Sequence, residues 1–180
     1  DSQTSTLFKL NSAVSGFYHR VLRESQKGGP ARDYLEKRKI PSDVIEEFKL
    51  GYAPDGWDTL VKFLKKHNIP PSLAEKLGLV VKKQSGDGYY DRFRNRVIFP
   101  IRNVEGKVIG FGGRRIKESD EPKYINSPES EIYHKRKNFY GLDSSKDHIR
   151  KNKRAIIVEG YTDFLSLFSA GVKNVVATLG

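Results

Sequence analysis

The stretch "RAIIVEGYTDFLSLFSAGVKNVVATLG", residues 154–180, decides the predicted fold class. Its first apolar residues, "AIIV", are rich in β-branched side chains and are typical of a strand buried on both faces of a parallel sheet. A helix is expected next, with Thr162 as its cap, Asp163 in its first turn and Gly171 as its stop. The closing "NVVAT" predicts a second buried strand, so the segment is a strand, helix, strand unit of an α/β fold.

Glu159 directly follows the first of these strands. In open sheets of this kind, ligands bind at the carboxyl ends of the strands. A lone carboxylate at a strand end is usually bonded to backbone amides, and that interpretation stays open here. Mg²⁺, however, binds through one or two carboxylates together with substrate phosphates, so Glu159 is also a candidate metal ligand.

The composition of the chain favours a polyanionic partner. Its 180 residues include 33 Lys and Arg against 22 Asp and Glu, a net charge of +11. Such an excess makes nucleic acid the leading class of partner. The absence of Cys excludes disulfides and Cys-rich zinc sites, and no apolar run is long enough for a membrane helix. We therefore expect a soluble, cytoplasmic protein with no membrane partner.

Most of the charge lies in the middle of the chain. Residues 81–154 contain 19 Lys and Arg against 10 Asp and Glu. The segments "GYYDRFRNR", "GFGGRR" and "PKYINSPESEIYHKRKNFYGL" mix these cations with Tyr, Phe, Asn and Gly. Any single cation is more simply a solvated surface residue. Together, the side chains suit base stacking and phosphate binding, and the glycines would permit close backbone approach.

Hydrophobic periodicity predicts a helical first section, about residues 1–80. Helices are expected at residues 7–24, 32–38, 40–48, 57–67 and from 72 to a stop at Gly78, with a turn-rich break at 51–56. Ser42 is the expected cap of the third helix, and Ser72 with Glu75 forms a capping box for the fifth. Packing, without any chemistry, is the simplest role for this section.

A strand-rich section, about residues 81–150, follows. "RVIFPI" and "KVIGFGGRRI" flank "RNVEG", in which Gly106 fits a short hairpin loop with a bulge. Pro100 favours an edge strand. Residues 118–131 are an expected polar loop. The polar segment 144–153 is the predicted boundary between a domain of residues 1–150 and a second unit of residues 151–180.

The final segment, from "VEGYTDF" onward, resembles the opening of a Toprim domain. Together with "YDRFRNRVIFPIRNVEGKVIGFGGRRI", "PKYINSPESEIYHKRKNFYGL" and "IPSDVIEEFKLGYAPDGWDTLVKFL", it resembles the catalytic core of bacterial replicative DNA primases of the DnaG type. The resemblance covers nearly the whole chain. It implies an α+β N-terminal subdomain followed by the first strand, helix and strand of a Toprim fold, truncated at Gly180.

The resemblance also implies roles for particular residues. Glu159 would be a catalytic metal ligand for Mg²⁺ or Mn²⁺, and Asp163 a further catalytic acidic residue. Arg136 stands where the family commonly has a small residue, and it could add a phosphate contact or do nothing. The residues implied to bind template DNA or nucleotide are Arg92, Arg94, Arg114, Lys123, Tyr124, Asn126 and Lys135.

The implied activity is the synthesis of short RNA primers on a single-stranded DNA template from nucleoside triphosphates. A replicative helicase is an implied partner, through a module absent from these residues. The family's metal site also uses aspartates in a later Toprim strand, which this sequence does not contain. We therefore expect the native chain to continue past Gly180, and the 180-residue segment alone to be inactive.

Two other functions stay open on the sequence. Another Toprim enzyme, such as a topoisomerase or nuclease, would share Glu159 but lacks support from "KYINSPES" and "HK". A non-catalytic single-stranded nucleic-acid-binding module would need no metal, and its affinity would survive Glu159→Gln. Both alternatives share the salt dependence of any phosphate-led binder.

Overall fold

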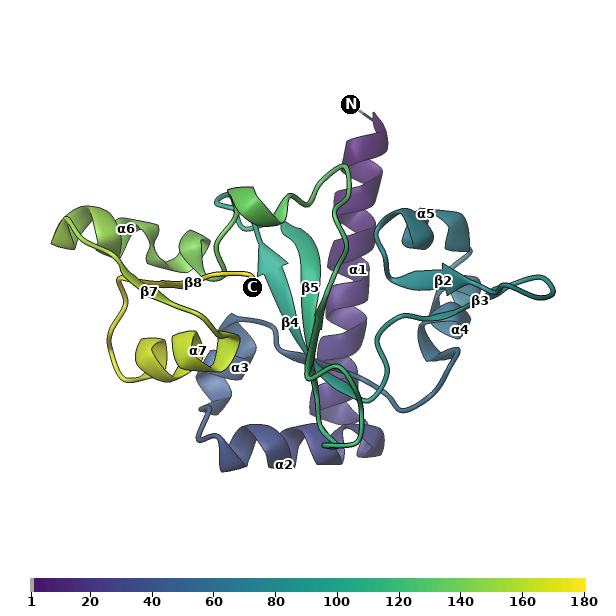
Figure 1. Cartoon of the computed structure of the whole chain (residues 1–180), viewed down its shortest axis with the longest axis horizontal. Coiled ribbons are helices and arrows are strands. Elements are labelled where there is room, and N and C mark those ends of the chain that lie inside the picture. Colours follow the sequence, from purple (N-terminus) through teal and green to yellow (C-terminus); the bar gives the residue numbers. More distant parts are fainter. Residues whose placement is uncertain (1) are drawn as a thin grey trace.

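The computed structural model describes residues 2–180 and confirms a mixed α/β fold (Figure 1). Short 3-10 turns lie at Gln26–Gly28 and Lys135–Lys137. The helices are α1 (Ser2–Glu24), α2 (Gly29–Lys37), α3 (Ser42–Glu47), α4 (Thr59–Lys66), α5 (Pro71–Lys76), α6 (Leu142–Asn152) and α7 (Tyr161–Ser169). The strands are β1 (Gly51–Ala53), β2 (Val80–Lys82), β3 (Tyr89–Asp91), β4 (Arg96–Arg102), β5 (Val108–Arg115), β6 (Tyr124–Asn126), β7 (Ile156–Val158) and β8 (Val175–Ala177).

A four-stranded antiparallel sheet in the order β1-β4-β5-β6 forms the centre of the molecule. The predicted β4–β5 hairpin and its bulge are confirmed, because the register shifts between Ile101 and Arg102. Gly106 adopts a φ of +85° in the connecting turn, a conformation that favours glycine. The strands β2 and β3 form a separate antiparallel hairpin.

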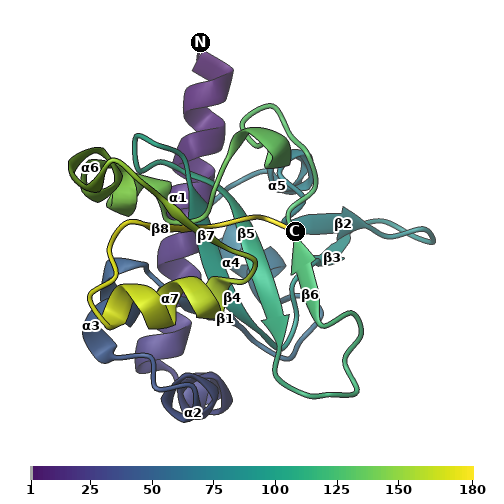
Figure 2. The same cartoon turned by 60° about the vertical axis from the view of Figure 1, so that its left-hand side comes forward.

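This sheet separates two apolar cores. Alternate residues of a strand point to opposite faces, so Val97 and Phe99 of β4 belong to one core and Ile98 to the other. The first core is completed by α2, α3, α7 and β8, and the second by α1, α4 and α5. Figure 2 shows α7 and α1 on different sides of β4 and β5. Within residues 2–180, no helix is long and apolar enough to cross a membrane.

The predicted strand, helix, strand unit is confirmed as β7, α7 and β8. The two strands pair in parallel, with Val158 opposite Ala177. Val175 and Ala177 of β8 are fully buried, but Ile157 of β7 is 59% exposed. The expectation that β7 is buried on both faces is therefore wrong. The reason is that β8 is its only strand partner among the described residues.

Three predicted helix caps are wrong. Ser42, Ser72 and Thr162 each lie inside their helix, and the cap positions are Pro41, Pro70 and Gly160. Each of these cap positions has an extended backbone, and the helix begins at the next residue. The helices therefore begin earlier than the position of the first Ser or Thr suggests. The predicted stops at Gly78 and Gly171 are confirmed, with φ values of +67° and +95°.

The cap of α4 comes from a distant strand. The carboxylate of Asp91 in β3 accepts hydrogen bonds from the amides of Leu60 at 2.8 Å and Val61 at 3.1 Å. These amides have no partner within the helix, so Asp91 stabilises its first turn. Burial nevertheless raises the pKa of Asp91. A local sequence pattern cannot predict such a cap.

Two short strands lie where loops were expected. β1 lies in the predicted turn-rich break, and β6 lies in the predicted polar loop. β4 is consequently an interior strand, so the edge-strand expectation from Pro100 is wrong for the strand as a whole. The pairing with β1 ends at Ile98, so Pro100 interrupts no hydrogen bond on that side. The polar segment 144–153 is largely the helix α6.

Candidate nucleic-acid and metal site

Asn126 at the end of β6 joins three segments that are distant in sequence. Its Nδ2 donates to the carbonyl of Leu179 at 2.9 Å, and its Oδ1 accepts from the hydroxyl of Tyr161 at 2.7 Å. Its own carbonyl accepts from Arg92 Nη2 at 3.2 Å. Asn126 therefore holds β6, the start of α7 and the end of β8 together. Its predicted contact with nucleic acid or nucleotide stays a prediction.

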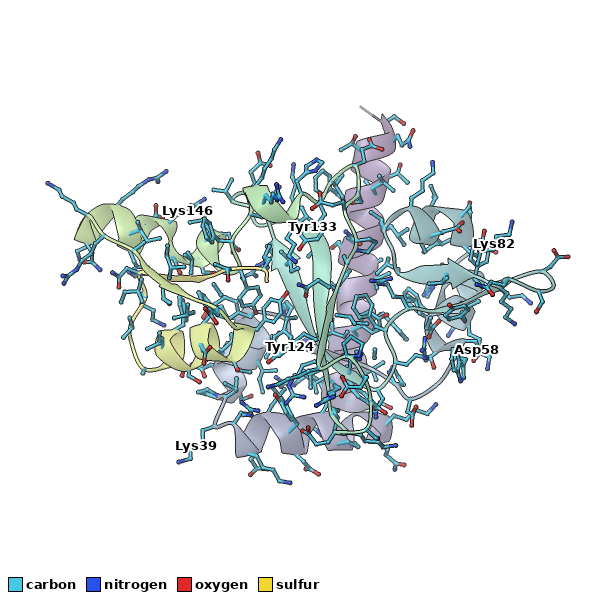
Figure 3. The ribbon with its side chains drawn as sticks, viewed as in Figure 1. Lys39, Asp58, Lys82, Tyr124, Tyr133 and Lys146 are labelled. Atoms are coloured by element: carbon cyan, nitrogen blue, oxygen red, sulfur yellow. The ribbon has the colours of Figure 1, made fainter. Side chains whose placement is uncertain are left out.

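Arg114 of β5 lies between two tyrosines. Its Cζ is 5.5 Å from the ring centroids of both Tyr34 and Tyr124, and only 4% of the residue is exposed. Nη1 donates to the carbonyl of Arg115 at 2.6 Å. Lys123 is exposed beside the Tyr124 ring, with its Nζ 6.0 Å from the ring centroid. Figure 3 labels Tyr124 near the centre of the molecule. This cluster concentrates positive charge at the β5–β6 edge.

Two neighbouring arginines line a hollow of about 300 Å³ near the same edge, together with Asp55, Asp120 and the buried Arg96. Arg92 is half-buried, and burial lowers its pKa. Arg94 is also half-buried and donates to the carbonyl of Asp91 at 2.6 Å. Arg96 was not singled out in the sequence, and it donates only to backbone carbonyls, so its role is to hold the loop before β6.

An exposed aromatic cluster was also missed. Arg94 Cζ lies 3.9 Å from the ring centroid of Trp57, and Tyr90 meets the same ring edge-on with centroids 5.5 Å apart. Trp57 is 63% exposed, the highest value among the exposed large hydrophobic residues of the described chain. We call Trp57, Tyr90 and Arg94 the Trp57 stack. The sequence signal was a lone Trp in the polar stretch "PDGWD".

Glu159 and Asp163 flank the start of α7. Glu159 is exposed and makes no hydrogen bond or ion pair within residues 2–180. Asp163 lies in the first turn of α7, where a Cβ on Gly160 would stand 3.0 Å from its Oδ2. Because β7 and β8 are parallel and Val158 lies opposite Ala177, Glu159 leaves the sheet at the same edge as residue 178. This is the edge at which ligands are expected.

Glu159 and Asp163 offer the donor atoms for one side of a metal site. Within the described chain, no three or more His, Asp or Glu side chains converge. Glu159 and Asp163 are four residues apart on either side of Gly160, and both offer exposed carboxylate oxygen. Mg²⁺ prefers oxygen ligands and needs only one or two carboxylates when phosphates and water complete its shell. The donors present therefore fit a partial magnesium site.

Lys135 lies beside the end of β8. A Cβ on Gly180 would stand 3.4 Å from Lys135 Nζ and 3.9 Å from Asn126 Nδ2, so these predicted residues converge there. A hollow of about 440 Å³ opens at this point. Its lining consists of Glu129, Lys135, Arg136, Asn138, Phe139, Thr178, Leu179 and Gly180. The Lys135 amide donates to Glu129 and lowers the pKa of that carboxyl group.

The predicted basic residues share one electrostatic property. Within residues 2–180, Arg92, Arg94, Arg114, Lys123 and Lys135 have no carboxylate within ion-pair distance. Other cations of the chain do have such partners, as at the Arg115 pairs with Glu118 and Glu121. The predicted site therefore carries positive charge that no carboxylate compensates, a property it shares with other cations of the described residues, such as Arg20 and Lys66.

The aromatic and glycine residues of the basic section have a different role from the one expected. Tyr133, Tyr140 and Phe111 are buried, so they are core residues and cannot stack bases. A Cβ on Gly112 would stand 2.4 Å from the Tyr161 ring, and one on Gly113 would stand 2.8 Å from Phe93. These glycines allow close approach of the protein's own side chains. The accessible aromatic groups near the site include Tyr124, the Trp57 stack and Phe139, which lines the hollow beside Lys135.

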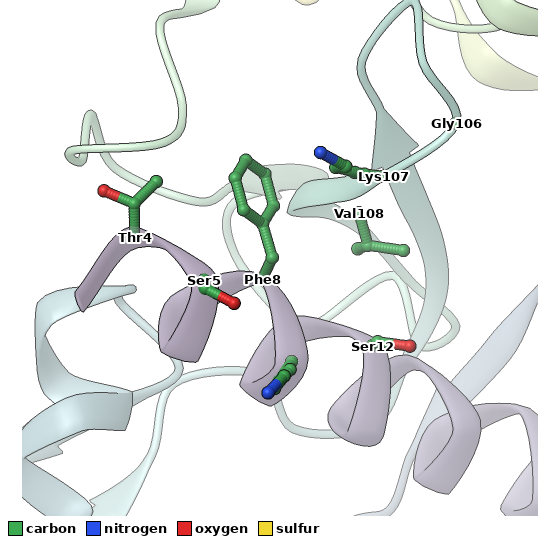
Figure 4. Close-up of a pocket in the computed structure, with 8 residues that line it drawn as sticks. Thr4, Ser5, Phe8, Ser12, Gly106, Lys107 and Val108 are labelled. Atoms are coloured by element: carbon green, nitrogen blue, oxygen red, sulfur yellow. The ribbon is translucent and has the colours of Figure 1, made fainter. Parts of the chain in front are cut away.

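A further hollow, of about 670 Å³, lies away from these residues (Figure 4). It is formed by the N-terminal turns of α1, including Ser5 and Phe8, and by Lys107 and Val108 at the start of β5. None of the predicted site residues lines it. Size alone therefore does not locate the functional site in this fold.

Comparison with protein families gives two matches along the chain. A family described as "DNA primase catalytic core, N-terminal domain" matches residues 17–146. A family described as "Toprim domain" matches residues 153–180. The DNA primase of Synechocystis sp. is 47% identical over 176 residues, covering 97% of this chain and 27% of that protein. The DNA primase of Halalkalibacterium halodurans is 45% identical over 174 residues, covering 97% and 29%.

Solved structures agree with the sequence relatives. The RNA polymerase domain of Mycobacterium tuberculosis primase DnaG, in complex with a double-stranded DNA oligomer with a 6-nucleotide overhang, gives a TM-score of 0.91 at 39% identity. The match covers 98% of this chain and 55% of that chain. A DnaG primase catalytic domain bound to ssDNA gives a TM-score of 0.89 at 40% identity, covering 99% and 57%.

The antiparallel sheet, followed by a parallel unit with a carboxylate at its open edge, defines an α/β domain that leads into a Toprim fold. The chain belongs to the family of the DNA primase catalytic core, N-terminal domain. The resemblance predicted from the sequence is confirmed. The chain spans less than a third of the length of the curated relatives, 27% and 29% of the two described above.

Proposed function

We propose that this chain forms the template- and nucleotide-binding part of a DNA primase catalytic core. The parent enzyme would synthesise short RNA primers on single-stranded DNA from nucleoside triphosphates. The observation that carries the proposal is the convergence of Lys135 and Asn126 at the end of β8, on the same sheet edge as Glu159. Cytoplasm is the proposed compartment, and a replicative helicase is a proposed partner through residues outside this chain.

The proposed chemistry is nucleotidyl transfer: a ribonucleotide hydroxyl loses its proton and bonds to the α-phosphate of an incoming nucleoside triphosphate, and the bond to the leaving pyrophosphate breaks. When bound, Mg²⁺ or Mn²⁺ would neutralise the negative charge that develops on the reacting phosphate. Glu159 would hold the metal, with Asp163 at its side. Lys135 would orient the triphosphate, because its ammonium group lies beside Gly180, at the sheet edge where the β7 and β8 strands end. Asn126 would fix the end of β8 against the sheet through its bond to Leu179.

The template strand would follow the accessible cations of the sheet edge. Arg92 and Lys123 are available for phosphates, and the Trp57 stack presents an exposed ring for a base. Stacking and phosphate contacts tolerate any sequence, as a template site requires. The predicted roles of Arg94, Arg114 and Tyr124 in binding belong to this proposal.

The decisive experiment compares Glu159→Gln with Glu24→Gln in the full-length enzyme. Glu24 is exposed, lies at the end of α1 and has no ion-pair partner within residues 2–180, so its replacement is a matched control. We expect Glu159→Gln to lower primer synthesis by about 10²–10³-fold, with single-stranded DNA affinity unchanged. Glu24→Gln should leave both quantities unchanged.

A second readout does not depend on activity. Mn²⁺ should broaden the amide NMR signals around Glu159 in the 180-residue chain, and Glu159→Gln should weaken that broadening. DNA nicking without ribonucleotides would assign the site to another kind of Toprim enzyme. DNA binding without any metal-dependent synthesis by the full-length protein would leave a non-catalytic binding module.

A further inference from the structure

A second basic surface lies on the opposite side of the sheet from α7. It is a groove of about 380 Å³ between α1 and α4, which we call the α1–α4 groove. Its lining consists of Phe17, Arg20, Thr59, Lys62, Phe63, Lys66 and His67. The members from α4 are three or four residues apart, so they share one helix face. None of the residues predicted from the sequence to bind nucleic acid lines it.

The walls of this groove are cationic. Arg20, Lys62 and Lys66 are exposed, and no carboxylate lines the groove. Lys62 pairs with Asp58 at 3.0 Å, but both side chains are more than half exposed, and such pairs contribute little. Arg20 and Lys66 have no carboxylate partner within the part of the chain that the structure describes. The groove therefore has positive charge that the protein itself does not neutralise.

The floor of the groove is aromatic. The rings of Phe17 and Phe63 are stacked with centroids 4.5 Å apart, and His67 lies against Phe63 at 4.3 Å. Both phenylalanines are half-buried, and His67 is exposed. Flat rings flanked by cations are typical of surfaces that bind single-stranded nucleic acid without sequence preference. An acidic protein segment would match the charge but gives no reason for the rings.

The groove also begins close in sequence to the Trp57 stack. Thr59, at the start of α4, follows Trp57 by two residues, and the groove residues of α4 extend for about 10 Å along the helix axis. In Figure 3, the neighbouring Asp58 lies on the side of the molecule formed by α4 and β3, away from α7. A strand stacked on Trp57 therefore has a basic surface available for its next phosphates.

We propose that the α1–α4 groove binds the phosphate backbone of single-stranded nucleic acid and extends the template path beyond the Trp57 stack. The identity of that strand as template rests on the proposed function. The groove itself would bind any single strand, since its contacts are to phosphates and ring faces. Its location predicts that it contributes to template capture and not to the chemical step.

The test compares two triple variants by fluorescence anisotropy with a labelled oligonucleotide of about 20 nucleotides, longer than a typical single-strand site. One variant carries Arg20→Gln, Lys62→Gln and Lys66→Gln. The control carries Lys27→Gln, Lys76→Gln and Lys151→Gln, which remove the same charge from exposed positions outside every hollow described above. A charge-preserving triple, Arg20→Lys, Lys62→Arg and Lys66→Arg, controls for folding.

We expect the groove variant to bind about 10- to 100-fold more weakly at ~0.1 M salt, and the slope of log affinity against log salt to fall by about 2. The control and the charge-preserving triple should stay close to the wild-type chain. In the full-length enzyme, the groove variant should raise KM for template and leave kcat unchanged. The binding readout stands even where wild-type primer synthesis is absent, so the two proposals can fail separately.

Equal affinities and equal salt slopes for the groove variant and its control would overturn the proposal. A second result would also overturn it: labelled poly-glutamate that binds the wild-type chain and is released by the groove variant, while DNA affinity matches the control. That outcome would assign the groove to an acidic protein partner.

Discussion

Gly112→Ala tests how the antiparallel sheet positions the start of α7. A Cβ at this position would stand 2.4 Å from the Tyr161 ring. To reach an ordinary contact, the ring would have to retreat by about 1 Å. It cannot do so freely, because it is stacked on Phe99 at 4.8 Å and 6° and meets Tyr140 edge-on at 4.8 Å. The added methyl group therefore forces a choice between displaced rings and a displaced helix.

Two effects of Gly112→Ala should lower the free energy of unfolding. Overpacking of a well-filled core costs about 1–3 kcal/mol. Displacing Tyr161 also removes the hydrogen bond from its hydroxyl to Asn126, worth about 1 kcal/mol. Together these predict that the free energy of unfolding falls by about 2–4 kcal/mol. With a urea m-value of about 2 kcal/mol/M, the unfolding midpoint should fall by about 1–2 M.

Urea unfolding of the 180-residue chain, followed by circular dichroism, measures this change. Gly16→Ala is the matched control, because Gly16 lies inside α1 and a Cβ there would meet only the end of the Arg20 side chain. It should raise the free energy of unfolding, by up to about 1 kcal/mol. In a Tyr161→Ala background, Gly112→Ala should become nearly neutral. An equal cost of Gly112→Ala in both backgrounds would refute the steric explanation.

Three further predictions concern other parts of the molecule. Asp91→Ala should lower the free energy of unfolding by about 1–3 kcal/mol and speed amide exchange in the first turn of α4; unchanged exchange there would contradict the capping role. Lys49 and His19 lower the pKa of Glu46 to about 2. The ionised Glu46 carboxylate should therefore stabilise the fold fully above its normal pKa, and this stabilisation should be lost as pH falls toward 2. Glu46→Gln should flatten this acid dependence in urea titrations, and an unaltered profile would exclude the pairing in solution. Trp57→Ala should weaken single-stranded DNA binding by about 1–3 kcal/mol and leave the slope of log affinity against log salt unchanged. A change in that slope without a loss of affinity at low salt would contradict a base contact.

The helices of the first section could largely be predicted from the sequence, because the apolar spacing of α1 and α4 is a local property. Their caps could not be predicted. The first turn of α4 is capped by Asp91, which belongs to β3, and the cap positions of α3, α5 and, later in the chain, α7 are Pro41, Pro70 and Gly160. Caps supplied by tertiary contacts or by backbone conformation leave no Ser or Thr signal.

Most residues of the candidate site could be predicted from the sequence, but their exposure could not. The charge count located the basic section, and the family resemblance supplied individual residues such as Lys135. The sequence could not distinguish an aromatic ring that is free to stack from one that fills the core. Tyr161 and Trp57 are both aromatic residues beside polar ones, yet the first is 5% exposed and the second 63%. Burial depends on contacts with β4 and β5 that are distant in sequence.

The three bonds of Asn126 couple the two halves of the chain mechanically. One amide side chain and its carbonyl tie the final residues after β8, the first residue of α7 and the guanidinium of Arg92 to the same sheet edge. A ligand that pulls on the residues beside Lys135 would therefore also shift Arg92, on the side where the strand is proposed to lie. In this fold, binding of a ligand in the hollow beside Lys135 and binding of the strand near Arg92 are therefore expected to change together, because Asn126 contacts the segments on both sides.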